Sequence, residues 1–195
     1  MSAGFQYKLN PSLEMEELCD VQTLHHKRGP YKLDTTGLES GSVLPRFTPV
    51  CVDLAKRSCV VVKNAKVLED ATSNATSIKI TKNSLVTTGM ILGTGKKGAE
   101  VSAIDKSNAD YDVLTLTAAF GEKVSANQVL FEASAAGGTT PKNTANFVIY
   151  ETTKIDSGIV LVALIMQAFE IQEEKLTLPF SDKDKEALTS RFQFE

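Results

Sequence analysis

Three short segments hold residue types and spacings that could support chemistry, and the first is rich in glycine. Residues 93–98 read GTGKKG and match the Gly-x-Gly-x-x-Gly spacing of dinucleotide-binding loops. Such a loop must open a helix, because the helix N-terminus faces the pyrophosphate. Residues 99–105 instead alternate as a strand does, and the Gly-Lys-Ser/Thr ending of a P-loop is missing. The segment is therefore predicted to be a hairpin tip that carries two exposed lysines.

The second segment is acidic and spans residues 105–112. It gathers the carboxylates of Asp105, Asp110 and Asp112 with the amide of Asn108. Calcium loops also place oxygen ligands at alternate positions, but they need a central glycine and a downstream bidentate glutamate. Neither stands at the required position. Asparagine and aspartate side chains commonly bond to their own backbone in turns, so the sequence predicts a solvated hairpin turn here.

The third group consists of cysteine and histidine. Adjacent histidines such as His25 and His26 point apart, and no fourth ligand joins them and Cys19 at a structural-zinc spacing. A Cys–His nucleophile pair would lack preorganisation in a segment outside the core. Cys51 and Cys59 could pair across neighbouring strands, but free buried thiols are favoured in a chain without a visible secretion signal. We therefore predict no catalytic, cofactor-binding or metal-ligating residue, no cofactor and no enzymatic activity.

Charge and hydropathy argue against two classes of partner. The 195 residues include 21 Lys and Arg against 24 Asp and Glu, which gives a net charge of −3. A nucleic-acid binder usually shows a basic excess, because phosphate neutralisation supplies most of its affinity. The longest apolar run covers residues 159–166, whereas a membrane span needs about 20 residues. We expect neither nucleic acid nor a membrane as a partner, and we expect synthesis in a cytoplasm, since residues 1–8 contain no apolar signal region.

The elements that must position these segments fall into two parts. Residues 1–42 are predicted to form an extended N-terminal arm, because no amphipathic period persists beyond residues 13–18 and glycine and proline recur after them. One helical turn is expected within this arm at residues 11–18, where Ser12 can cap the N-terminus. Residues 43–195 are predicted to form one β-rich domain.

The β-rich part consists of short segments that are rich in valine or alternate with period two, separated by turn residues at short intervals. This spacing suits antiparallel hairpins and leaves no room for crossover helices. The expected strands are residues 48–53, 58–68, 77–81, 90–93, 100–104, 114–117, 129–133 and 146–152. Residues 135–146 are mostly small, and they are expected to connect two strands that lie apart.

Residues 159–166 and 181–194 complete the pattern. The first segment is apolar on both faces, so we expect a strand at the centre of the core. Residues 181–191 are predicted to form a helix capped by Ser181, and Phe192 and Phe194 then alternate as in a final edge strand. The predicted fold class is mainly β, a small antiparallel sandwich or barrel with an extended N-terminal arm and one short C-terminal helix.

The second half of the chain resembles a known family. The resemblance lies in the order of its apolar strands and turns, at residues 104–105, 110–116, 129–133, 141–146, 148–150, 158–171 and 175–179. In this order the chain is similar to the head-fibre and capsid-decoration proteins of tailed bacteriophages, especially phages of Bacteroidales, and distantly to the lambda-type decoration fold. The resemblance implies a β-tulip-like fold, no enzymatic activity, and homo-oligomers that are trimers or sometimes dimers.

The resemblance also implies a partner and a location. The chain is expected to bind the major capsid protein on the outer capsid surface of the virion, with residues 1–42 as an arm that docks on the capsid or on a sister subunit. The apolar anchors expected in that arm are Tyr7, Leu9, Leu13, Met15 and Leu18, with packing back onto their own domain as the alternative. A competing function is an adhesion or carbohydrate-binding module of a fibre or tail. The absence of Trp and the presence of only four Tyr argue against it, because sugar sites usually contain aromatic platforms.

Overall fold

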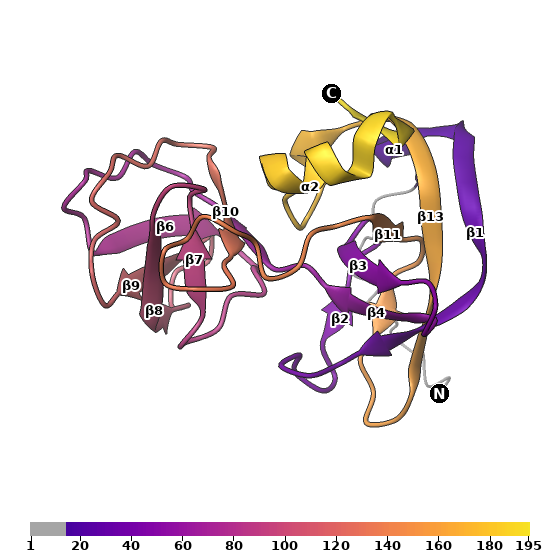
Figure 1. The fold of residues 1–195 in the computed structure, drawn as a ribbon, viewed down its shortest axis with the longest axis horizontal. Helices are drawn as coiled ribbons and strands as arrows, with labels where there is room; N and C mark the ends of the chain where they lie inside the picture. The colour runs from indigo at the N-terminus through magenta and orange to yellow at the C-terminus, as the bar shows by residue number, and fades with distance from the viewer. Residues whose placement is uncertain (1–14) are drawn as a thin grey trace, which may run out of the picture.

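The computed structural model describes residues 15–195, and these residues adopt the mainly β architecture that the sequence predicts. Figure 1 shows two lobes, of which the larger contains α1, α2 and the C-terminus. The smaller lobe is built from one continuous stretch, residues 64–132, whose strands form a sheet of their own. Residues 43–195 therefore form two β lobes with separate sheets, where the sequence predicted one β-rich domain.

The larger lobe, called the barrel below, combines the two ends of the chain. Its elements are α1 (Met15–Leu18), β1 (Asp20–Asp34), β2 (Val43–Leu44), β3 (Pro49–Asp53), β4 (Ser58–Val61), β11 (Phe147–Ile149), β12 (Thr153–Lys154), β13 (Val160–Ile171), η1 (Glu173–Lys175), α2 (Asp182–Leu188), η2 (Thr189–Arg191) and β14 (Phe192–Phe194). Five strands close a ring in the order β1, β4, β3, β11 and β13, because β1 also pairs with β13. Closure removes the free strand edges that an open sheet would expose.

The small lobe closes in a similar way. Its strands are β5 (Asn64–Lys66), β6 (Ser77–Thr81), β7 (Ile91–Gly93), β8 (Gly98–Asp105), β9 (Tyr111–Leu116) and β10 (Val129–Glu132). They lie in the order β5-β10-β7-β8-β9-β6, and a bridge between Val67 and Ile80 joins the two ends of this order. All pairings of this lobe are antiparallel, as predicted, whereas β1 pairs in parallel with β4 and β13 in parallel with β14 in the barrel.

β1 corrects the prediction that residues 1–42 lie outside the core. It runs antiparallel to β13, from the pair Asp20 and Phe169 to the pair Leu33 and Val160. The register shifts between Lys27 and Tyr31, where Gly29 has a φ of 80° and is followed by a proline. Glycine at positive φ and proline, which has no N–H group, are typical of a β-bulge. In the sequence alone, the same two residues indicated a loop. Residues 20–34 are thus a strand of the barrel.

Alternate side chains of the ring strands fill the inside of the barrel. Tyr31 and Leu33 of β1, and Val160 and Val162 of β13, are all buried in one cluster, while the intervening Lys32 is exposed. A second layer covers one part of the outside, where Phe180 and Leu188 pack over β11 and β13. β13 is therefore buried on both faces only near Leu164 and Ile165, which are both 0% exposed.

The start of β13 and the residue before it differ from the prediction of a strand covered on both sides. Ile159 is 74% exposed and Leu161 is 56% exposed, because no second layer covers the barrel there. The predicted strand at residues 58–68 is also divided. β4 ends at Val61 in the barrel and β5 begins at Asn64 in the small lobe, so the chain crosses between lobes at this point.

α2 contacts both chain segments that connect the two lobes. As predicted, Ser181 caps the helix, and its hydroxyl and backbone N–H both contact Asp184 in a capping box. Asp184 is 1% exposed, and its Oδ2 accepts a hydrogen bond from Asn64 Nδ2 at 2.8 Å while its Oδ1 accepts one from Ala145 N at 2.8 Å. Asn64 begins the entry into the small lobe and Ala145 ends the return from it, so one carboxylate binds both crossings. The helix itself is shorter than predicted, since the turn after Leu188 is a 3₁₀ turn.

Candidate functional site

The glycine-rich segment is a hairpin tip, as predicted. β7 ends at Gly93 and β8 begins at Gly98, and both intervening lysines are exposed. The structure adds a role for the glycines. A Cβ atom at Gly93 would lie 2.6 Å from the Gly138 carbonyl oxygen, and one at Gly98 would lie 2.5 Å from the Ala136 carbonyl oxygen. Because they have no Cβ atom, these glycines allow the loop around residues 136–138 to pack against the hairpin backbone. This loop occupies the space from which a phosphate would have to approach that backbone.

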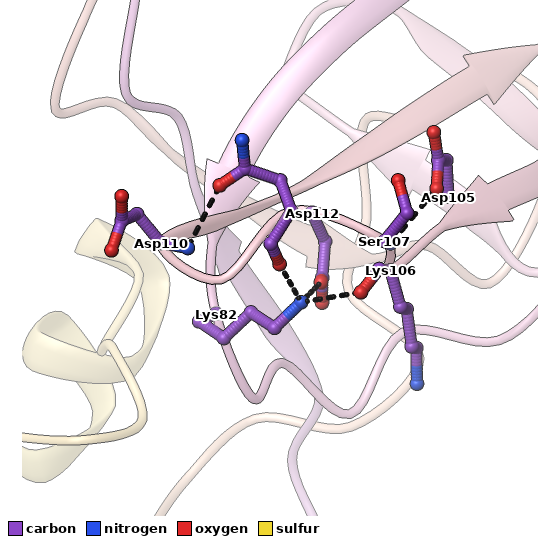
Figure 2. Close-up of polar contacts among 7 residues, drawn as sticks. Lys82, Asp105, Lys106, Ser107, Asp110 and Asp112 are labelled. Atoms are coloured by element: carbon purple, nitrogen blue, oxygen red, sulfur yellow. Dashed lines mark hydrogen bonds and ion pairs between the residues drawn. The ribbon is translucent and has the colours of Figure 1, made fainter.

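The acidic segment joins β8 to β9 in a turn whose side chains bind their own backbone, as predicted. Asp105 Oδ1 accepts a hydrogen bond from Ser107 N at 2.9 Å, and Asn108 Oδ1 accepts one from Asp110 N at 2.8 Å. Hydrogen bonds from Ser107 lower the pKa of the Asp105 carboxyl below its ordinary value, with Lys82 adding a small effect in the same direction. Figure 2 shows these contacts around the turn.

Lys82 is the residue of this site that sequence reasoning missed. Its ammonium lies 2.7 Å from Asp112 Oδ1 and donates to the carbonyl oxygens of Lys106 at 2.9 Å and Asn108 at 2.6 Å (Figure 2). Asp112 is 1% exposed, so this carboxylate is not solvated as predicted. The contact with Asp112 is an ion pair without good hydrogen-bond geometry. The cation bound by this oxygen-rich turn is thus the ammonium group of Lys82. Lys82 directly follows β6, so the sequence of the turn itself does not indicate it.

The three cysteines are free, as predicted, so the alternative of a Cys51–Cys59 disulfide is wrong. Burial raises the pKa of Cys59 to about 12, with further contributions from Asp34 and Cys51. Burial and the nearby Asp20 raise the pKa of Cys19 to about 11. A thiolate is the reactive form, so neither group is an effective nucleophile near neutral pH.

The histidines lie on β1 and are exposed, and the His26 ring packs edge-on against Tyr150 with 4.3 Å between the ring centroids. Within residues 15–195, no group of three or more His, Cys, Asp and Glu side chains could hold a metal ion. The same residues include no helix long and apolar enough to cross a membrane.

The predicted docking residues fall into two groups. Tyr7, Leu9 and Leu13 lie outside the described residues. Met15 and Leu18 belong to α1, where Leu18 is 3% exposed and both pack in the outer layer of their own barrel. These two side chains thus contact their own barrel, and the docking role of the five residues stays a prediction.

The described residues thus define a protein of two closed β lobes, in which contacts within the chain occupy the glycine-rich hairpin tip and the acidic turn. A family model described as head fiber protein matches residues 1–193. The chain therefore belongs to the phage head-fibre family, and it is a structural protein of a bacteriophage and a component of the virion. Comparisons with curated proteins and with solved structures found no match.

Proposed function

We propose that this protein binds the outer surface of the phage capsid, as a decoration protein or as the base of a head fibre, and that it performs no catalysis. The observation that carries the proposal is the match of the head-fibre family model over residues 1–193, which is nearly the whole chain. The proposed partner is the major capsid protein, and the proposed assembly is a homo-oligomer, with a trimer favoured over a dimer.

Two physical features support this proposal. A capsid repeats each binding site by symmetry, so modest contacts add up to a high avidity without any single dominant contact. The barrel also carries exposed apolar side chains of the kind that protein contacts use. Examples are Ile159 at 74% exposed and Leu161 at 56%.

The test is to mix the full-length protein with purified capsids that lack it and to measure co-sedimentation. We expect saturable binding in a fixed ratio to the capsid protein. Failure to bind capsids, or binding to glycan arrays without binding to capsids, would overturn the proposal, and the second outcome would favour an adhesion module.

A full-length variant with Tyr7, Leu9 and Leu13 all replaced by alanine tests the proposed anchors. We expect weaker capsid binding, because these apolar side chains would lose contact area. Leu54→Ala is the matched control, since Leu54 is an exposed apolar residue in the turn between β3 and β4. Equal binding of both variants would remove Tyr7, Leu9 and Leu13 from the docking surface.

A further inference from the structure

A cleft of about 750 Å³ lies between the two lobes. The small lobe contributes residues 83–87, which follow β6, and the barrel contributes residues 37–39, 42–43, 45–46 and 175–178. Within this cleft Leu85 reaches across and packs against the core of the barrel. Junctions between lobes are preferred positions for binding sites, and this volume lies in the usual range for them.

The charged residues that line the cleft are mainly basic. They are Arg46, Lys106 and Lys175, against the single acid Glu39. Lys175 Nζ donates to the backbone carbonyl of Glu17 at 3.2 Å. Among the described residues, none of these three cations forms an ion pair with a carboxylate. This local positive charge contrasts with the net charge of −3 of the whole chain.

Arg46 is the residue that most clearly indicates a ligand in this cleft. Its Nε atom is buried, and it has no hydrogen-bond partner among the described residues. A buried donor without an acceptor destabilises a protein, and the half-buried Arg46 side chain that carries it lines the cleft, where a carboxylate would supply an acceptor for the guanidinium. A guanidinium binds a carboxylate in a planar, two-pronged geometry, so the preferred acceptor is a carboxylate.

Apolar side chains complete the cleft. Val43 is 52% exposed and Leu178 is buried, and both line the same space as Leu85. A ligand that matches this lining carries an apolar group next to its carboxylate. An acidic residue beside an aliphatic or aromatic residue in a protein segment has this composition.

We infer that the cleft is a docking site for an acidic segment of the capsid protein, with a carboxylate on Arg46 and an apolar neighbour against Val43 and Leu85. This inference rests on the proposed function and specifies which surface performs it. Charge complementarity is the argument for the occupant, since the cleft is basic on a protein that is acidic overall.

The test compares capsid binding of full-length variants by co-sedimentation. Arg46→Gln removes the charge, and we expect the dissociation constant to rise about tenfold or more, as the loss of a charge-assisted hydrogen bond predicts. Arg46→Lys keeps the charge without the two-pronged donor and should have an intermediate effect. Lys96→Gln is the matched control, because it removes the same charge from the exposed hairpin tip of the small lobe.

A second variant keeps the test decisive if Arg46→Gln lowers the thermal stability. Thr177→Glu places a carboxylate at an exposed position in the same cleft, where it repels an acidic ligand, and we again expect at least a tenfold weaker interaction. Unchanged binding of both variants, with wild-type protein still bound to capsids, overturns the cleft as the docking site and leaves the proposed function intact. Failure of the wild-type protein to bind overturns both.

Discussion

The barrel and the small lobe are both closed β structures, but different parts of the chain close them. The barrel joins β1, near the start of the chain, to β13, near its end. The small lobe is formed by residues 64–132 alone, and two of its five strand pairings, β7 with β8 and β8 with β9, are hairpins between successive strands. Its closure is therefore local, whereas the barrel cannot close until both ends of the chain have been made. Because β1 and β13 are far apart in the sequence, we expect the barrel to form more slowly than the small lobe.

The two regions also stabilise buried carboxylates differently. Asp184 in the barrel is surrounded by neutral donors, namely Asn64, Ala145 and Ser181. Asp112 in the small lobe is balanced by the charge of Lys82. The contacts of Asp184 link the two lobes, whereas the ion pair of Asp112 stabilises one turn within the small lobe. Substitutions at the two sites should thus differ in how far their effects spread.

The largest effect is expected for Asp184→Ala. It leaves several buried donors without an acceptor and should lower the free energy of unfolding by about 3 kcal/mol. Chemical denaturation measures the loss, and hydrogen exchange should show faster exchange at the junction and over α2. Asp182→Ala, in the same helical turn but exposed, is the control and should lose about 0.3–1 kcal/mol at most. A loss confined to the small lobe would contradict the assigned role of Asp184.

Lys82→Met should have a somewhat smaller effect. It leaves Asp112 buried without its cation, and because the Lys82 side chain is 27% exposed, we expect a loss of about 2 kcal/mol. Faster hydrogen exchange should be limited to the small lobe. The double variant Lys82→Met with Asp112→Leu should recover part of the loss, since an apolar pair needs no compensation. No recovery in this double-mutant cycle would show that the pair is not the cause.

Gly138→Ala tests the contact between the return loop and the hairpin tip. Gly138 has a φ of 64°, and an added Cβ would collide with the Lys97 carbonyl. We expect a loss of about 1–2 kcal/mol, measured by thermal unfolding. The neighbouring Gly137→Ala is the control, because nothing lies within 4 Å of its Cβ position. Equal stability of the two variants would contradict the close packing at Gly138.

The smallest effect near neutral pH concerns the thiols of the barrel. Because burial raises the pKa of Cys59 to about 12, the folded state keeps the thiol protonated where the unfolded chain, with an ordinary pKa near 9.0, releases the proton. This contribution to stability is complete below pH 9.0 and is lost as the pH rises toward 12. Mass spectrometry after iodoacetamide treatment at pH 8 should show Cys19 and Cys59 unmodified in the folded protein. Rapid modification of Cys59 without unfolding would contradict its burial.

Local features of both lobes were predictable from the sequence. The hairpin at residues 93–98, the turn at residues 105–112 and the cap at Ser181 all depend on groups within a few positions of one another. The strands of the small lobe were located well for the same reason. The bulge at Gly29 and Pro30 shows the limit of this local prediction. In an isolated segment these residues would end a strand, but here pairing with β13 and β4 keeps β1 extended and they only bend it.

The sequence by itself determined the fold class, the turns and the helix cap, since propensity and capping act between neighbours in the chain. Only the tertiary structure decided that β1 belongs to the barrel, that Lys82 neutralises Asp112, and that Arg46 lines a cleft between lobes. These outcomes depend on contacts between distant positions, such as Asn64 and Asp184, which are 120 residues apart. Such contacts form only when long-range strand pairing brings the groups together, so local composition carries no record of them.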